Sequence, residues 1–252
     1  MRMQVVFTTE FYDDRDNDST VWYKHFVPHY RRVPDNDLPK KAKLGFRYES
    51  TTVNPEKLLP WLQKKLEARG VRFIQQDVKR IQDVKDATGC KVIVNASGLG
   101  AFDLASDKAV IPARGQTMFV KTDFNELKMW QGSHYTYVIP RMGTGGVIVG
   151  GVSQEGNLDR EIDQGLRPDI LSRVKMLAGG SLDAIDLERD VQKDFVAFRP
   201  GRRGGYRLEA EGDIIHAYGF GSLGYIYSYG VGLKVRDLVQ SVIGRRLPAS
   251  RL

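Results

Sequence analysis

The sequence predicts an α/β fold, because capped amphipathic helices alternate with short apolar strands along its 252 residues. The clearest helix follows Asn54, which is a good N-cap residue, with Pro55 in the first helical position. The clearest strands, 91–95 and 213–218, each run directly into a glycine-rich turn. This alternation of element types is the basis of the predicted class.

The first half of the chain is punctuated by turn signals. Residues 1–20 show no decisive period and carry an acidic stretch, and residues 27–43 are broken by proline. The helix that begins at Pro55 has an apolar stripe and is stopped by Gly70. Residues 71–75 are expected to form a short strand.

The second half is predicted to contain a hairpin, a helix, three strands and a final helix. Strands 135–140 and 147–151 flank a turn at 142–146, which predicts the hairpin. The remaining expected elements are an amphipathic helix over 167–177, strands at 194–199, 206–209 and 213–218, and a helix over 227–243.

Charge and composition exclude several classes. The net charge of +7 is compatible with nucleic acid, an anionic membrane or an anionic cofactor. The densest cationic cluster (Arg199, Arg202, Arg203 and Arg207) occurs once between apolar strands, unlike a repeated RNA-binding tail, so no nucleic-acid partner is expected. No apolar run approaches the roughly 20 residues of a membrane span, so no membrane is expected either. Cys90 is the only cysteine and is expected to be a small buried residue.

The usual catalytic motifs are absent or poor. His25 and His29 are four residues apart, but Pro28 breaks any helix there and no glutamate completes a zinc motif, so no metal is expected. The sequence contains neither a G-x-S-x-G nucleophile elbow nor a Walker loop. Hydrolase and kinase activities therefore have little support.

The segment G-F-G-S-L-G at 219–224 matches the dinucleotide-binding pattern between a strand and a helix. Only 28 residues follow Gly224, too few for the second strand of a Rossmann unit. Glycines at a helix N-terminus still suit a phosphate or an electron-rich ring edge. A glycine-rich corner with no ligand is the alternative.

Two further segments and one arginine extend this picture. V-I-V-N-A-S-G at 92–98 repeats the strand-to-glycine geometry, and A-R-G-Q at 113–116 is a third place where backbone could approach a ligand. Arg199 ends an apolar strand, and a guanidinium can clamp a carboxylate through two parallel hydrogen bonds. Together they suggest a buried anion site, although each alone is more often a turn or a solvated side chain.

These segments, together with Y-V-I-P-R, V-I-V-G-G, F-R-P-G-R-R-G-G-Y-R-L-E and H-A-Y-G-F-G-S-L-G-Y, resemble the D-amino-acid oxidase family in order and spacing. The resemblance extends from Val21 to Leu252 and is closest to fungal members; the pairing of the last two motifs is shared with the D-aspartate oxidase sister family. It implies an FAD-binding Rossmann-like domain, incomplete at its N-terminus, interleaved with an antiparallel-sheet substrate domain. Residues 1–52 and 111–200 would form the substrate domain, and residues 53–110 and 201–252 the FAD-binding domain.

The resemblance also implies site roles. Arg199 would bind the substrate carboxylate, Tyr137 would donate its hydroxyl to it, and Ser222 would lie near the substrate amino group. The family transfers the α-hydrogen as hydride to FAD with no essential protein acid or base, and oxygen then yields hydrogen peroxide, an oxo acid and ammonia. The cofactor-binding residues implied are Val78, Ser97, Gly221, Ser222, Leu223, Gly224, Tyr225 and Ile226.

The family's first strand, G-x-G-x-x-G loop and helix have no counterpart before Met1. An incomplete gene model is favoured over a split product or a decayed copy. Two alternatives stay open, a non-catalytic truncated remnant and a D-aspartate oxidase. An acidic substrate would require a second cation, for which the stretch before Val138 offers only His134, so neutral D-amino acids are favoured.

The terminal Ser250-Arg251-Leu252 is a variant of the peroxisomal S-K-L address, which implies recognition by the peroxisomal import receptor. A peroxisomal location is expected, or a cytoplasmic one if this signal is not read. A homodimer is a further possible assembly.

Overall fold

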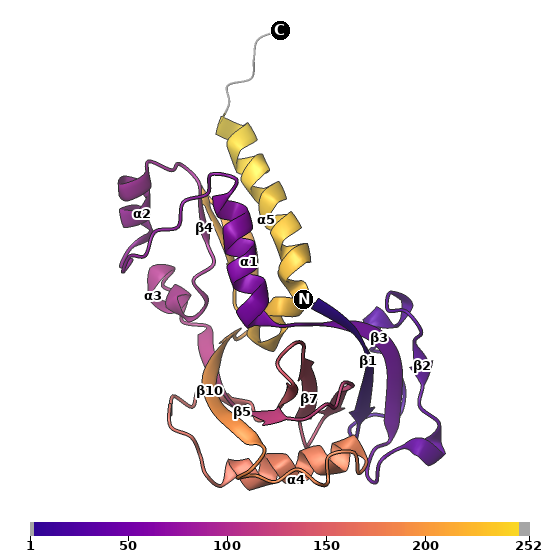
Figure 1. Ribbon diagram of the computed structural model, residues 1–252. Coiled ribbons are helices and arrows are strands. Elements are labelled where there is room, and N and C mark those ends of the chain that lie inside the picture. Colours follow the sequence, from indigo (N-terminus) through magenta and orange to yellow (C-terminus); the bar gives the residue numbers. More distant parts are fainter. Residues whose placement is uncertain (1–2, 247–252) are drawn as a thin grey trace. The chain divides into compact units, whose positions relative to one another are not determined.

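The computed structural model describes residues 3–246, and its contacts divide the chain into two compact units, each assembled from three separate segments (Figure 1). Unit 1 consists of Met1–Phe73, Gly115–Val152 and Arg160–Ala197, and unit 2 of Ile74–Arg114, Ser153–Asp159 and Phe198–Leu252. Residues 53–73, which were expected in the FAD-binding domain with residues 74–110, belong to unit 1.

A nine-stranded, largely antiparallel sheet has the strand order β10-β5-β8-β7-β6-β1-β3-β2, with β9 paired to β5. Strands β1 and β6 run parallel, whereas the pairs β1–β3, β6–β7, β7–β8 and β5–β8 are antiparallel. Its strands are β1 Met3–Tyr12, β2 Arg31–Arg32, β3 Leu44–Val53, β5 Val110–Lys121, β6 Leu127–Gln131, β7 Thr136–Arg141, β8 Gly146–Gly150, β9 Gln154–Glu155 and β10 Val191–Arg202. The predicted hairpin is therefore confirmed as β7 and β8.

The main core of unit 1 lies between this sheet and α4 (Leu166–Ala178), which covers one sheet face (Figure 1). Side chains alternate between the faces of a strand, so Phe11, Trp130 and Val138 share the face that packs against Ile170 and Val174 of α4. The predicted helix over 167–177 is confirmed by α4. Two short 3-10 turns, η1 Trp22–His25 and η2 Asp35–Asp37, lie between β1 and β3.

Helix α1 (Pro55–Glu67) begins where the sequence predicts. The side chain of Asn54 accepts a hydrogen bond from the Glu56 backbone N–H at 3.2 Å, and its amide donates to the Met142 carbonyl at 3.2 Å. This cap therefore also ties the start of the helix to the β7–β8 turn.

The strand expected at 71–75 is not formed. This segment has no regular structure, and Val71, Phe73 and Ile74 are exposed. Alternating apolar residues satisfy the pattern of a strand, but a strand also requires a neighbour for its backbone groups, and no described strand pairs with this one.

Unit 2 contains a three-stranded sheet in the order β11-β12-β4. β11 (Arg207–Glu211) and β12 (Ile214–Tyr218) form a hairpin, and β12 runs parallel to β4 (Ile93–Asn95). The helices of this unit are α2 Ile81–Thr88, α3 Ala101–Leu104 and α5 Gly224–Arg246, with 3-10 turns η3 Gly98–Gly100 and η4 Gly221–Leu223. Helix α5 packs against β11 and β12.

The structure shows where the cysteine lies and whether any described helix could span a membrane. Cys90 is exposed, so its expected burial is wrong; it follows the C-cap Gly89 of α2, in the turn that leads to β4. Within residues 3–246, no helix is both long enough and apolar enough to cross a bilayer.

Candidate functional site

Strands β4 and β12 end side by side, and each leads into a glycine turn. They are parallel with Asn95 opposite His216, so the two turns leave the same edge of the small sheet. Asn95 Oδ1 accepts from the Ser97 hydroxyl at 2.7 Å and from its backbone N–H at 3.2 Å, and Asn95 Nδ2 lies 3.4 Å from His216 Nδ1. The two strand-to-glycine segments singled out in the sequence are therefore neighbours in space.

His216 is buried beneath this junction. Burial, and then the charge of Arg207, lower its pKa, so the ring is neutral near pH 7. Its Nε2 lies 3.3 Å from a carboxylate oxygen of Glu211, within ion-pair distance but without hydrogen-bond alignment. The neutral ring thus fills the space below the turn that carries Ser97.

The glycine turn after β12 requires glycine at its first position. Gly219 has a φ of +84°, and a Cβ there would lie 2.7 Å from Arg202 Cβ. Gly221 also has a positive φ of +57°, with nothing within 4 Å of where its Cβ would be. Phe220 between them stacks on Tyr206, with centroids 5.1 Å apart and planes at 28°. Contacts of Gly219 and Phe220 therefore fix the first part of the turn, whereas no atom packs against the open side of Gly221.

Helix α5 begins directly after this turn, at Gly224. The side chains of Ser222, Leu223, Tyr225 and Ile226 are all exposed, and nothing lies within 4 Å of a Cβ built at Gly224. A 23-residue helix presents a partial positive charge and free backbone N–H groups at this end. Open backbone and a helix N-terminus suit an anionic group or an electron-rich ring edge.

Arg199 lies near the end of β10 and is half-buried. The next residue, Pro200, is 3.5 Å from where a Cβ of Gly98 would be, so the segment with Arg199 contacts the Ser97–Gly98 turn. Arg199, Ser97 and the glycine turn therefore all belong to unit 2.

Asp107 is a site-supporting residue that sequence reasoning missed. Its Oδ2 accepts from Arg202 Nε at 2.8 Å and from the Tyr218 hydroxyl at 2.8 Å. Burial alone would raise its pKa, but these hydrogen bonds outweigh burial and lower it. The carboxylate thus joins β10, just beyond Arg199, to the last residue of β12. The only sequence signal was an arginine three residues after Arg199.

Tyr137 of β7 belongs to unit 1 and is 6% exposed. Its ring lies over two glycines, since a Cβ at Gly150 would be 2.6 Å from Tyr137 Cζ and one at Gly151 would be 2.9 Å from Cε1. Tyr135 packs edge-on against the same ring, with centroids 5.5 Å apart. The V-I-V-G-G motif therefore makes room for Tyr137.

A single cross-strand row contains Tyr137. The register pairs Tyr137 with Gly150 on one side and Met129 on the other, then Met129 with Glu10 and Glu10 with Phe46. Cross-strand partners share a sheet face, so Glu10 lies on the same face as Tyr137, two strands away.

Glu10 is a buried carboxylate that sequence reasoning did not single out. Its oxygens accept from the hydroxyls of Tyr12 at 2.6 Å, Tyr23 at 2.7 Å and Tyr48 at 2.5 Å. Burial first, and then the charge of Glu10, raise the pKa of each of these tyrosines far above its ordinary value. An arrangement built from residues 10, 12, 23 and 48 leaves no recognisable motif.

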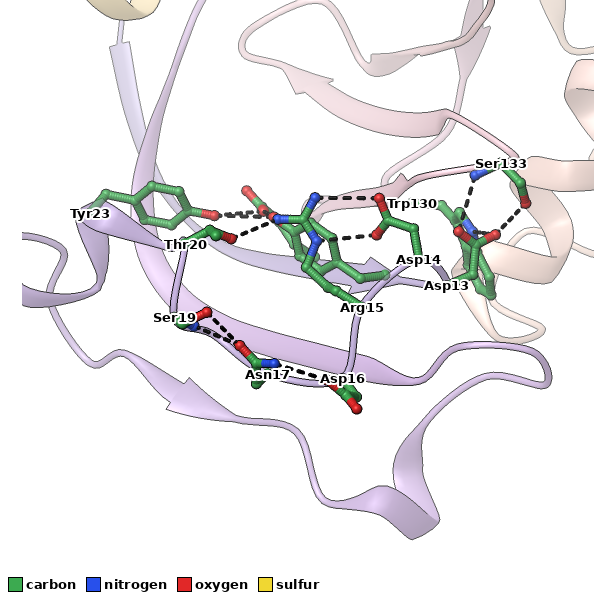
Figure 2. Close-up of polar contacts among 12 residues, drawn as sticks. Asp13, Asp14, Arg15, Asp16, Asn17, Ser19, Thr20, Tyr23, Trp130 and Ser133 are labelled. Carbon is green, nitrogen blue, oxygen red and sulfur yellow. Dashed lines mark hydrogen bonds and ion pairs between the residues drawn. The ribbon is translucent and has the colours of Figure 1, made fainter.

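The acidic stretch after β1 makes hydrogen bonds within its own loop and to Trp130 and Ser133 (Figure 2). Asp13 accepts from Trp130 Nε1 at 3.1 Å and from the Ser133 backbone N–H at 3.0 Å. Arg15 donates to Asp14 at 3.1 Å and to the Thr20 hydroxyl at 3.1 Å. No group of three or more potential metal ligands occurs among the residues that the structure describes.

The remaining predicted site residues are placed as follows. Val78 is half-buried in the irregular segment before α2, in unit 2. His134 is exposed, and its carbonyl accepts from the Thr136 hydroxyl at 2.6 Å. Ser250, Arg251 and Leu252 lie outside the described residues.

Most of this chain matches one known protein family. Residues 24–238 match the DAO family, described as FAD dependent oxidoreductase. The chain belongs to this family. The resemblance that the sequence motifs suggest is thereby confirmed.

Curated relatives of this DAO-family chain include a D-amino-acid oxidase of Schizosaccharomyces pombe, 32% identical over 220 residues, which covers 82% of this chain and 63% of the relative. A D-amino-acid oxidase of Fusarium vanettenii is 28% identical and covers 88% and 66%; human D-aspartate oxidase is 28% identical and covers 93% and 69%. The chain spans about two thirds of the length of these relatives.

Solved enzyme structures share the fold of this chain. Glycine oxidase from Geobacillus kaustophilus superposes with a TM-score of 0.74 at 18% identity, covering 99% of this DAO-family chain and 73% of that enzyme. L-proline dehydrogenase from P. horikoshii gives 0.69 at 10% identity, covering 98% and 74%. The predicted α/β class, with its large antiparallel sheet and smaller sheet, is confirmed.

Proposed function

We propose that this chain acts as an FAD-dependent D-amino-acid oxidase, which converts a D-amino acid, O2 and water to a 2-oxo acid, ammonia and hydrogen peroxide. The main supporting observation is in unit 2, where the segment that carries Arg199 contacts the Ser97–Gly98 turn, beside the glycine turn that opens α5. An anion clamp and an open helix N-terminus in one unit are what this reaction requires of the protein.

The residues expected to hold FAD fit that role. Gly221, Ser222, Leu223, Gly224, Tyr225 and Ile226 offer exposed backbone and side chains around the start of α5, and Ser97 is exposed on the adjoining turn. When bound, FAD would accept hydride from the substrate α-carbon and deliver the electrons to oxygen. The positive end of α5 would stabilise negative charge next to the cofactor.

The substrate would be held by Arg199, Tyr137 and Ser222. Arg199 would form a bidentate ion pair with the α-carboxylate, and the Tyr137 hydroxyl would donate to the same group. Ser222 would lie near the amino group. These contacts orient the α-hydrogen, so the chain contributes positioning rather than an acid or a base.

A neutral side chain on the substrate is favoured over an acidic one. The row that contains Tyr137 leads through Met129 to the Glu10 carboxylate, which would repel a second carboxylate. Of the cations near Tyr137 in sequence, His134 is exposed, and Arg141 on the same strand face is paired with Glu56 at 3.2 Å. The human D-aspartate oxidase relative keeps that activity as the alternative.

Domain roles, location and assembly complete the proposal. Unit 2 would be the flavin-binding part and unit 1 the substrate-binding part. The C-terminal tripeptide Ser250-Arg251-Leu252 would direct the chain to the peroxisome through the import receptor. A homodimer is a further proposal, and a non-catalytic role is the alternative that the experiment below would distinguish.

The decisive experiment is an absorbance spectrum of the purified chain after incubation with FAD, followed by D-alanine under nitrogen. Bound flavin that bleaches would support an oxidase. Bound flavin that bleaches with D-aspartate but not with D-alanine would favour the alternative substrate. No bound flavin, or no bleaching with either, would favour the non-catalytic role for this chain.

A further inference from the structure

A cavity of about 400 Å³ lies in unit 1, on the sheet face opposite to that of Tyr137. It is formed over β1, β2, β3 and β6, with Thr9 and Phe11 of β1 in its wall. Strand alternation places Thr9 and Phe11 on the opposite face from Glu10. The charged residues that line it are Arg31, Arg32, Asp37, Arg47, Glu126 and Lys128.

Three of the cations belong to one cross-strand row. The register pairs Arg31 with Arg47, Arg47 with Thr9, and Thr9 with Lys128. The row therefore places two arginines directly opposite each other and a lysine two strands further along, all on one face. Like charges directly opposite in a sheet destabilise it unless an anion lies between them.

The carboxylates of the cavity offset only part of this charge. Arg47 is ion-paired with Glu126 at 2.9 Å and packs over the Phe7 ring at 4.6 Å. Lys128 donates to the Ala178 carbonyl at 3.2 Å, which leaves two of its three ammonium hydrogens. Burial first, and then the Arg47 charge, lower the pKa of Lys128, against the effect of Glu126. Four cations and two carboxylates leave a net charge of +2 on the lining (4 − 2).

Arg31 is exposed at the open side of the cavity, where its guanidinium can move onto a ligand. Arg32, the next residue, is instead engaged with Asp35 at 3.1 Å. The guanidinium fork matches phosphate oxygens bidentately. The volume falls in the range of small-molecule sites, about 300–1,000 Å³.

We propose that this cavity binds a small polyvalent oxyanion of the phosphate class, held by Arg31, Arg47 and Lys128. A ligand with a single carboxylate would bind poorly, because Glu126 already supplies one carboxylate to the cavity. The site lies on the other face of the sheet from Tyr137, so its occupancy does not depend on the proposed oxidase reaction.

The test is calorimetric titration of the full chain with inorganic pyrophosphate at constant ionic strength, with sodium acetate as the singly charged control. Pyrophosphate should bind and acetate should not. Arg31→Ala should weaken pyrophosphate binding about tenfold, the usual effect of losing a charge-assisted contact. Arg31→Glu should abolish it. Arg31 is an exposed residue of a two-residue edge strand, so both variants should fold, which circular dichroism checks.

Two controls separate this site from other sources of binding. Arg72→Ala removes an equal charge from an exposed position of unit 1 outside the cavity and should leave the affinity unchanged. Gly219→Ala alters the turn at the proposed flavin site and should also leave it unchanged. The proposal is overturned if the wild-type chain binds no pyrophosphate at a concentration of about 10 mM. This concentration is well above a dissociation constant of about 1 mM, which is typical of a weak specific site. The proposal is equally overturned if Arg72→Ala weakens binding as much as Arg31→Ala, or if only Gly219→Ala does.

Discussion

At the residue scale, Glu10 gives the clearest link between burial and pH. Its three tyrosine partners have pKa values raised by burial and by the carboxylate, so the folded chain holds these phenolic protons more firmly than the unfolded chain does. Stability from this source is complete below the ordinary tyrosine pKa of about 10 and is lost as pH rises above it.

We therefore expect the melting temperature to fall steeply between about pH 10 and pH 11. Glu10→Gln removes the second cause of the raised pKa values but leaves the first, which is burial, so the fall should persist in this variant, which should cost about 1–3 kcal/mol at pH 7 through imperfect hydrogen bonding. Thermal unfolding at several pH values measures both. A melting temperature of the wild-type chain that stays constant from pH 10 to pH 11 would contradict this account.

Tyr137 separates a chemical contribution from a packing contribution. Tyr137→Phe keeps the ring over Gly150 and removes only the hydroxyl, so we expect a smaller loss of stability than in Gly150→Ala and a KM for D-alanine raised about tenfold, the effect of losing one hydrogen bond to a charged group. Gly150→Ala keeps the hydroxyl but places a Cβ 2.6 Å from the ring. It should destabilise the fold by about 1–3 kcal/mol. Steady-state kinetics and urea unfolding distinguish the two, and a stability loss in Tyr137→Phe as large as that in Gly150→Ala would refute the separation.

Arg199 carries the proposed carboxylate clamp. Arg199→Ala should lower kcat/KM for D-alanine by about 10- to 10²-fold, since a bidentate charged pair is worth roughly 1.5–3 kcal/mol. Arg199→Lys should recover only part of this loss, because an ammonium cannot form two parallel hydrogen bonds. Flavin binding, followed by absorbance, should be retained in both. Equal activity of the alanine and lysine variants would argue against a bidentate clamp.

At the element scale, the turn between β12 and α5 depends on one glycine. Gly219→Ala would combine a left-handed backbone with a Cβ 2.7 Å from Arg202. We expect its affinity for FAD to fall at least tenfold, since αL alanine alone costs about 1–2 kcal/mol.

Gly212→Ala is the matched control for this change. Gly212 also has a positive φ, +60°, in the β11–β12 turn, but nothing lies within 4 Å of its Cβ position. It should carry the backbone cost without the loss of FAD binding. Fluorescence titration of FAD compares the two variants, and equal losses would show that the turn itself is not special.

Elements with local signals were predictable from the sequence, and those held by distant partners were not. The N-cap at Asn54 and the turn between β7 and β8 act over a few residues, so α1 and the hairpin were found. β1 was missed because its partner β3 begins more than thirty residues after β1 ends. The opposite error at 71–75 has the same cause, since apolar alternation does not reveal whether a partner strand exists.

The candidate site shows the same division. Arg199, Tyr137 and the 219–224 turn were named because they lie in motifs, and the structure adds what supports them: Asp107 beneath Arg202, and the glycines under Tyr137. The Glu10 cluster and the row from Arg31 to Lys128 were invisible in the sequence, because each is created by strand register.

At the scale of the whole molecule, the chain passes between the two units five times, after Phe73, Arg114, Val152, Asp159 and Ala197. Strands β5 and β10 each run through one of these crossings. The segments of the two units alternate along the sequence, so no single cut of the gene could separate one unit from the other.

This threading dictates an order of events during synthesis. Because unit 1 is complete only after Ala197 and unit 2 needs the segment from Phe198 onward, a ribosome-bound chain holds both units unfinished until Ala197 has been made. β1 and β3 can pair early, whereas β10 must find β5 from about seventy residues away along the chain. A nick after Phe73, in the exposed segment 71–77, would leave an N-terminal fragment with only the first segment of unit 1, and unit 1 would regain its structure only if this fragment rejoined the rest of the chain.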